Sequence, residues 1–192
     1  MAVHRFDIAS LSAARWKNGG GVTREIVCSP AGTGMEGFDW RVSIATIDKP
    51  GPFSAFAGVD RVIMLLDGAG VRLRSQDGRV DHRLEVPHAS FAFVGDVALD
   101  CELLGGASTD FNVMSRQGRL KADVRVLRES GDVEPVERGL LLALAGRWRF
   151  NDIDCESGSG VWWDGEIRQW QATTSDAAAA MVAVRLEPTA TP

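Results

Sequence analysis

The segment Phe38-Asp39-Trp40-Arg41-Val42-Ser43-Ile44-Ala45-Thr46-Ile47 decides the fold class. From Phe38 to Ile44, large apolar residues alternate with Asp39, Arg41 and Ser43. Successive side chains of a β-strand point to opposite faces, so this period of two is typical of a strand in a sheet with two unlike faces. The segment therefore predicts a strand with one apolar face and one face that carries Arg41 and Ser43.

Asp-Gly pairs outside this segment predict hairpin turns. They stand at 67–68, 77–78 and 164–165, each between apolar runs. Asp and Gly both tolerate the positive φ angles that tight hairpin turns require. Further strands are expected at 22–28, 90–94, 99–104, 110–114, 122–127, 140–145, 148–150 and 181–186. More than ten short strands, with single helical turns only at 10–15 and 176–180, predict an all-β sandwich or barrel.

Composition bounds the domain organisation and the class of partner. The chain has 192 residues, of which 45% are hydrophobic and 24% charged, and this fits one domain or two small ones. A net charge of −5 lacks the basic footprint of a nucleic-acid-binding protein. No apolar run approaches the roughly 20 residues that cross a bilayer, and the N-terminus MAVHRFDIAS does not read as a secretory signal. We therefore expect neither a nucleic-acid partner nor a membrane partner.

Three cysteines without a C-x-x-C pair favour free thiols in a reducing cytoplasm rather than a disulfide framework. The histidines His4, His82 and His88 do not have the close spacing of metal ligands, so neither a metal nor another cofactor is expected. The motif Gly32-Thr-Gly-Met-Glu-Gly37 matches G-x-G-x-x-G, but a strand pattern follows it. Because a dinucleotide site needs a helix there, 29–37 is interpreted as a loop.

A composition shift at 117–137 divides the chain into domains 1–116 and 117–192, and the acidic residues Glu129, Asp132, Glu134 and Glu137 are interpreted as a solvated linker. The second domain is short for a closed barrel. We therefore expect residues 3–8 to cross over and pair with its strands. The tail at 188–192 is expected to be disordered.

The polar positions of two predicted strands are the candidate site. Arg41 and Ser43 share one face, and Asp110 and Asn112 share one face of 109–114. These faces either point to solvent or line a lumen in which arginine binds a carboxylate through two hydrogen bonds. The run Asn18-Gly-Gly-Gly21 is either a flexible turn or a loop whose backbone approaches a ligand. The aromatics of 51–56 either close a pocket mouth or plug a barrel end.

Five ordered stretches in residues 1–116 resemble the HutD/Ves family: Trp16-Lys-Asn-Gly-Gly-Gly-Val-Thr23 with Glu25-Ile26, Phe38–Ala45, Gly51-Pro-Phe-Ser54, Asp60-Arg61 and Asp110-Phe-Asn-Val-Met114. The resemblance implies a cupin-like double β-barrel, that is, a bicupin of two RmlC-like jelly rolls without the usual cupin metal histidines. It also implies either the HutD branch, associated with bacterial histidine utilisation, or the stress-linked Ves branch.

The resemblance further implies a non-enzymatic regulator of histidine utilisation that binds a small carboxylate metabolite, such as N-formylglutamate or urocanate. The site would lie in the N-terminal barrel. Arg41 and Arg61 would bind the carboxylate, with Glu25 or Asp110 balancing the Arg41 charge in the empty protein. The expected ligand-binding residues are Asn18, Glu25, Arg41, Ser43, Arg61, Asp110 and Asn112.

Two alternatives from other classes stay open. One is a metal-independent cupin-type enzyme that acts on a small carbonyl or carboxylate compound, with Glu25 or Asp110 as general base. The other is a protein-interaction module, for example a homodimer formed through a sheet face. A titrating carboxylate in a closed pocket favours the enzyme, and a large exposed apolar face without a polar cavity favours the interaction module.

Overall fold

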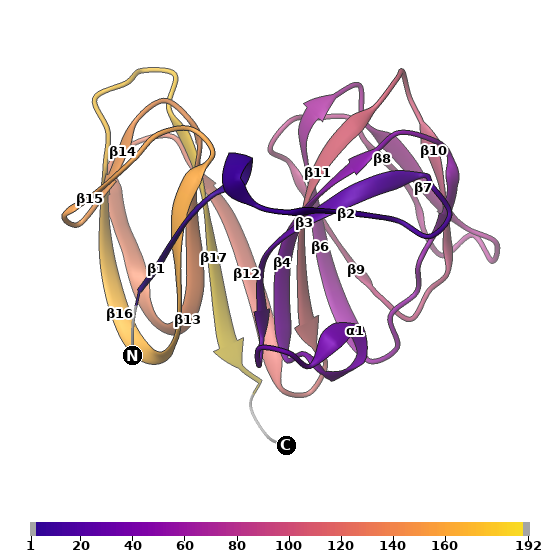
Figure 1. Cartoon of the computed structure of the whole chain (residues 1–192), viewed down its shortest axis with the longest axis horizontal. Helices are drawn as coiled ribbons and strands as arrows, with labels where there is room; N and C mark the ends of the chain where they lie inside the picture. Colours follow the sequence, from indigo (N-terminus) through magenta and orange to yellow (C-terminus); the bar gives the residue numbers. More distant parts are fainter. Residues whose placement is uncertain (1–2, 190–192) are drawn as a thin grey trace. The chain divides into compact units, whose positions relative to one another are not determined.

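The computed structural model describes residues 3–189 and divides the chain into two compact units. Unit 1 comprises residues 3–11 and 120–189 of the described chain, and unit 2 is Ser12–Arg119. Within the described residues, helix is limited to the one-turn α1 (Gly34–Gly37) and a 3-10 turn at Ile8–Ser10. The all-β class predicted from the strand patterns is therefore confirmed (Figure 1).

Unit 2 contains two antiparallel sheets. The larger has the order β2-β3-β4-β11-β6-β9, with bounds Ala13–Arg15, Gly21–Ser29, Trp40–Ile47, Ser108–Arg116, Val59–Gly68 and Ser90–Val94. The smaller has the order β5-β10-β7-β8, with bounds Gly51–Phe53, Leu99–Leu103, Val71–Ser75 and Asp81–Leu84. Apolar side chains from both sheets form one buried cluster that includes Ile63, Leu73 and Leu99, so this core joins the two sheets.

Unit 1 contains one antiparallel sheet of the order β12-β17-β13-β16-β14-β15. The bounds are Leu120–Leu127, Ala180–Pro188, Gly131–Ala145, Ser159–Thr173, Trp148–Phe150 and Ile153–Cys155. The N-terminal strand β1 (His4–Asp7) pairs with β16, with His4 opposite Trp162 and Asp7 opposite Ser159 (Figure 1). Residues 3–8 thus make the crossover expected for them. The core of this unit packs tryptophans such as Trp148 and Trp163 against small and branched apolar residues.

One of the three Asp-Gly pairs forms the expected hairpin. Asp77-Gly78 joins the paired strands β7 and β8. Asp67-Gly68 instead ends β6, and the chain continues into β7 of the other sheet. Asp164-Gly165 lies inside the continuous strand β16, where Gly165 has a φ of 90° and the register with β13 shifts. The prediction of hairpins at these two sites was wrong, because a positive φ serves a change of sheet or a β-bulge as well as a turn.

Other local predictions also need correction. Three of the four acidic residues interpreted as a linker, Asp132, Glu134 and Glu137, lie in β13, so they belong to a strand and not to a linker. The expected turn at 10–15 is replaced by the 3-10 turn at Ile8–Ser10 and by β2, and 176–180 contains no helix. Strand β17 reaches Pro188, whereas residues 190–192 of the predicted tail lie outside the described residues. Within 3–189, no helix has the length and apolar character needed to cross a membrane.

Candidate ligand-binding pocket

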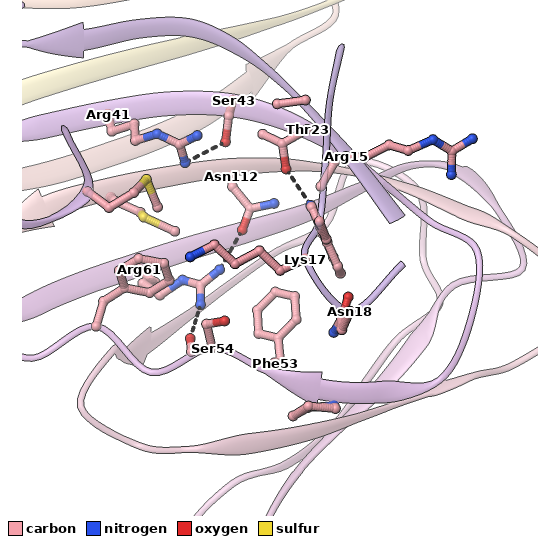
Figure 2. A pocket seen from close by; sticks show the side chains of 17 residues that line it. Arg15, Lys17, Asn18, Thr23, Arg41, Ser43, Phe53, Ser54, Arg61 and Asn112 are labelled. Carbon is pink, nitrogen blue, oxygen red and sulfur yellow. Dashed lines mark hydrogen bonds between the residues drawn. The ribbon is translucent and has the colours of Figure 1, made fainter. Parts of the chain in front are cut away.

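Unit 2 encloses a pocket of about 520 Å³, a size typical of small-molecule sites. Its walls come from α1, from β2, β3, β4, β5, β6 and β11, from the turn between β2 and β3, and from the segment that follows β5 (Figure 2). The lining residues are Ala14, Arg15, Trp16, Lys17, Asn18, Thr23, Met35, Arg41, Ser43, Ala45, Pro52, Phe53, Ser54, Phe56, Arg61, Asn112 and Met114.

Strand register brings the polar side chains of the pocket together. In the larger sheet, β11 lies between β4 and β6, and Met114 is opposite Arg41 on one side and Arg61 on the other. Asn112 is opposite Ser43. Cross-strand partners project from the same face of a sheet, so both arginines, Ser43 and Asn112 face the same cavity. The polar face predicted from the alternation in 38–47 is therefore the pocket wall.

Arg61 is a buried cation that contacts no carboxylate among the described residues. Its side chain donates from Nη1 to the Ser54 carbonyl oxygen at 3.1 Å and from Nη2 to Asn112 Oδ1 at 2.9 Å. The Nε atom is buried without a hydrogen-bond partner. Only 4% of the residue is exposed. A buried charge without a counter-ion is costly, and an anion in the pocket would offset that cost.

Aromatic rings and a second arginine define the electrostatics around Arg61. Its guanidinium carbon lies 4.4 Å from the ring centre of Phe53, and 5.2 Å from those of Phe56 and Phe93. Such cation–π contacts replace part of the lost hydration. Burial, and next the positive charge of Arg41, lower the pKa of Arg61 to about 9. The side chain therefore remains charged at neutral pH.

Arg41 has its own counter-ion, which distinguishes it from Arg61. Its Nε donates to Glu25 Oε2 at 2.7 Å, and its Nη1 donates to Ser43 Oγ at 3.2 Å. Glu25 is half-exposed and is not part of the pocket lining. Of the two carboxylates that were expected to balance Arg41, Glu25 is the one that contacts it.

An ordered turn between β2 and β3 forms another wall. Trp16 Nε1 donates to Thr23 Oγ1 at 2.7 Å, and the Gly20 amide donates to Asn18 Oδ1 at 2.9 Å. The Trp16 amide also donates to the Gly21 carbonyl oxygen at 3.0 Å. These bonds place Lys17 and Asn18 on the lining, while the three glycines that follow are absent from it. This segment contributes side chains to the pocket rather than a close approach of its glycine backbone.

Five of the seven predicted site residues line the pocket: Asn18, Arg41, Ser43, Arg61 and Asn112. Asp110 does not. It is fully buried, Oδ1 accepts a hydrogen bond from Ser108 at 3.1 Å, and Oδ2 has no partner. Burial raises the pKa of Asp110 to about 6. Asp110 lies two residues before Asn112 on β11, opposite Leu65 of the apolar core. Alternation therefore predicts correctly that Asp110 and Asn112 share a face of the strand, but not that Asp110 is buried beyond the end of the pocket.

Sequence reasoning missed several lining residues, among them Lys17, Thr23, Ser54 and Met114. All four were detectable, because each stands inside a stretch that resembles the family. Sequence analysis did single out the aromatic residues of 51–56. Of these, Phe53 and Phe56 line the pocket and lie against the Arg61 guanidinium.

The pocket lining contains no Asp, Glu, His or Cys. Elsewhere in residues 3–189, no three such side chains are grouped as a metal site would require. Cys101 is buried, and the pKa of its thiol is raised to about 12 by burial and then by the nearby Asp110 charge. The pocket therefore offers hydrogen-bond donors and positive charge, and its lining has no carboxylate, imidazole or thiol.

The chain is all-β with a cation-lined pocket in unit 2, and the solved structures that share its fold include cupin-like proteins. A variant of Bacillus subtilis oxalate decarboxylase OxdC shows the same fold with a TM-score of 0.64, covering 97% of this chain and 78% of that one at 8% identity. The chain belongs to the HutD family, whose model matches residues 8–182.

Two relatives are similar over most of their length. HutD from Pseudomonas fluorescens SBW25, in a structure from a formate condition, superposes with a TM-score of 0.86 at 30% identity, covering 98% of this chain and 100% of that one. Protein Ves from Cronobacter sakazakii is 38% identical over 159 residues, which is 82% of this chain and 85% of the relative. The expected family is thus confirmed, and both of its branches are represented.

Proposed function

We propose that this protein is a non-enzymatic regulator of histidine utilisation that binds a small carboxylate metabolite in the unit 2 pocket. N-formylglutamate and urocanate are the candidate ligands. The observation that carries the proposal is Arg61, a buried cation on the lining with an unused Nε donor and no carboxylate partner among residues 3–189. Membership of the HutD family supports the link to histidine utilisation.

Each lining group has a role in this proposal. The Arg61 guanidinium binds the carboxylate, and Arg41 adds positive charge at the same wall. Ser43, Asn18 and Asn112 supply neutral hydrogen bonds, the amides through their Nδ2 atoms. Phe53 and Met114 pack against the ligand's carbon skeleton. Glu25 acts through Arg41, whereas Asp110 is withdrawn as a ligand acceptor because it lies outside the lining.

The lining argues against the enzymatic alternative. A general base must lie within hydrogen-bond reach of the proton that it removes. Glu25 is bound to Arg41, Asp110 is outside the pocket, and the lining has no other carboxylate, imidazole or thiol. The proposal is therefore binding without turnover.

The interaction-module alternative has less support. Exposed large apolar side chains in the described chain are Met35, Val86, Val94 and Ile167, which stand on four different segments. Such scattered residues need no partner to explain them. We further propose that the two units are the two barrels of a bicupin, and that the protein acts in the cytoplasm.

Calorimetric titration tests the proposal. N-formylglutamate, urocanate, histidine and glutamate are titrated into the wild-type protein and into Arg61→Ala. The loss of one charge-assisted contact is worth roughly 1.5–3 kcal/mol, so the affinity should fall about tenfold to 150-fold. Arg74→Ala is the matched control, because Arg74 is a half-exposed arginine of unit 2 outside the pocket.

Nuclear magnetic resonance of the same mixtures, followed for hours, separates a regulator from an enzyme. The ligand spectrum should stay unchanged. No binding by any of the four compounds, or equal binding by wild type and Arg61→Ala, contradicts the assigned site. Conversion of a bound compound contradicts the non-enzymatic role.

A further inference from the structure

One wall at the mouth of the unit 2 pocket is held by few contacts. The exposed residues of the lining mark the mouth, and they come from β2 with the turn that follows it, from α1, and from β5 with Ser54. The buried residues of the lining, such as Arg61 and Asn112, form the floor. The α1 wall is a single helical turn within residues 30–37, and every residue of this segment is exposed (Figure 1). Met35 is its contribution to the lining.

Segment 30–37 is a loop whose two ends are joined. The Asp39 amide donates to the Ser29 carbonyl oxygen at 2.7 Å, so the chain leaves β3 and enters β4 at the same point of the sheet. Among the described residues, one hydrogen bond joins the backbone of 30–37 to another part of the chain: Arg116 Nη2 donates to the Glu36 carbonyl oxygen at 2.7 Å. The segment can therefore move without breaking the sheet.

Two glycines precede Met35 in this segment. Gly32 and Gly34 have φ angles of 79° and 66°, and a Cβ atom at either position would meet open space. Glycine adopts positive and negative φ with similar ease, so these residues can absorb a change in the direction of the backbone. The Thr33 side chain between them makes only a weak hydrogen bond, with the Cys28 thiol. Met35 therefore follows a flexible joint.

Arg116 holds the other end of the segment. Besides its bond to the Glu36 carbonyl oxygen, its Nε and Nη2 atoms donate to the Phe38 carbonyl oxygen at 3.2 and 3.1 Å. Its Nη1 donates to the Ala57 carbonyl oxygen at 3.1 Å, and its guanidinium carbon lies 5.2 Å from the centre of the buried Phe38 ring. One guanidinium thus joins two loops, and each loop carries a lining residue next to the carbonyl that is bound.

We propose that residues 30–37 form a lid on the unit 2 pocket, which moves at Gly32 and Gly34 while Arg116 positions its fixed end. In this structure the lid stands open, because 46% of Met35 is exposed although Met35 lines the pocket. A bound ligand offers Met35 a surface to pack on, and the flexible side chain of methionine adapts to such a surface. Contacts made only by the closed lid shift it toward closure. The inference rests on the proposed function, because it takes the pocket to bind a ligand, and it adds a conformational step to that binding.

Oxidation of methionine by dilute hydrogen peroxide, read by mass spectrometry, tests the lid in the wild-type protein. Met35 is 46% exposed, against 4% or less for Met64, Met114 and Met181, so without ligand it should oxidise about tenfold faster than these three. Saturating N-formylglutamate or urocanate should slow the oxidation of Met35 by about fivefold or more, and should leave Met64 and Met181 unchanged. Amide hydrogen exchange in 31–37 should slow on the same addition.

Arg116→Ala tests the fixed end of the lid, with no ligand required. Amide exchange in 31–37 should become about tenfold faster, because the one hydrogen bond from outside to this backbone is lost. Added ligand should then slow the oxidation of Met35 by less than about twofold. Arg116→Lys keeps donors for the carbonyl groups and should restore part of this protection. Arg74→Ala, at a half-exposed arginine of unit 2 outside the pocket, should behave as wild type.

The outcomes separate the lid from the proposed function. If calorimetry shows that neither compound binds, the proposed function fails, and amide exchange decides on the lid: equal exchange in wild type and Arg116→Ala refutes it, and faster exchange in the variant supports it. If a compound binds but Met35 oxidises at the same rate with and without it, the lid is refuted while the binding site stands.

Discussion

Replacing Arg61 with methionine should abolish ligand binding and, at the same time, stabilise the folded protein. Methionine has a similar length and fits among Phe53, Phe56 and Phe93, which surround the guanidinium. Replacing a residue that only supports the fold makes the protein less stable. Replacing a residue that is kept for binding, at a cost to the fold, makes the protein more stable.

The magnitude follows from the burial of Arg61. The pKa is lowered from 12.5 to about 9, and one pKa unit corresponds to about 1.4 kcal/mol, so holding the charge in the empty pocket costs about 5 kcal/mol. Methionine avoids this cost but leaves Asn112 Oδ1 and the Ser54 carbonyl oxygen without their donor. Those losses amount to about 2–4 kcal/mol. The variant should therefore be about 1–3 kcal/mol more stable at pH 7.

Urea unfolding followed by tryptophan fluorescence measures the stability change, and calorimetry with N-formylglutamate and urocanate measures binding. Arg74→Met is the control, because Arg74 is half-exposed and pairs only loosely with Glu102, at 3.6 Å. Its stability should change by less than about 0.5 kcal/mol. An Arg61→Met protein that is less stable than wild type yet still binds the ligand would refute the reasoning.

Two further predictions concern Asp110 and Gly139. Burial raises the pKa of Asp110 to about 6, above its ordinary value of 3.8, so the folded state binds this proton more tightly than the unfolded state and wild type should lose about 2 kcal/mol as the pH rises from 4 to 7. The Asp110→Asn variant should not show the loss of stability that ionisation of Asp110 causes. The measurement is the urea midpoint as a function of pH, and the same pH profile for both proteins would contradict this prediction. At Gly139 a Cβ would lie 2.6 Å from both the Val184 carbonyl oxygen and the Trp163 ring, so Gly139→Ala should lower the free energy of unfolding by about 1–3 kcal/mol. Gly131→Ala on the same strand, where a Cβ meets open space, should cost less than 1 kcal/mol in the same assay, and similar losses in both variants would count against the packing argument.

Much of the fold could be predicted from alternation alone. The period of two in 38–47 places Arg41 and Ser43 on one face, and the structure makes that face a pocket wall. Asp-Gly pairs were less informative. Only Asp77-Gly78 forms a hairpin, because the pair indicates a positive φ and not which strands pair afterwards.

The candidate site was predictable as a set of faces but not as a cavity. Alternation assigns Asp110 to the face of Asn112, yet the pocket ends between them and Asp110 enters the apolar core. Where a cavity ends depends on packing between the two sheets of unit 2, which no local pattern records. Lys17 was missed for a related reason: an exposed lysine in a turn looks the same whether it faces solvent or a pocket.

A crystal structure of the protein with N-formylglutamate or urocanate bound tests the central claim most directly. We predict one ligand in the unit 2 pocket, with a carboxylate oxygen about 2.7–3.2 Å from a guanidinium nitrogen of Arg61, the buried cation that has no carboxylate partner among residues 3–189. Glu25 should keep its bond to Arg41. A ligand bound elsewhere on the chain, or one in this pocket whose carboxylate does not contact Arg61, would contradict the account.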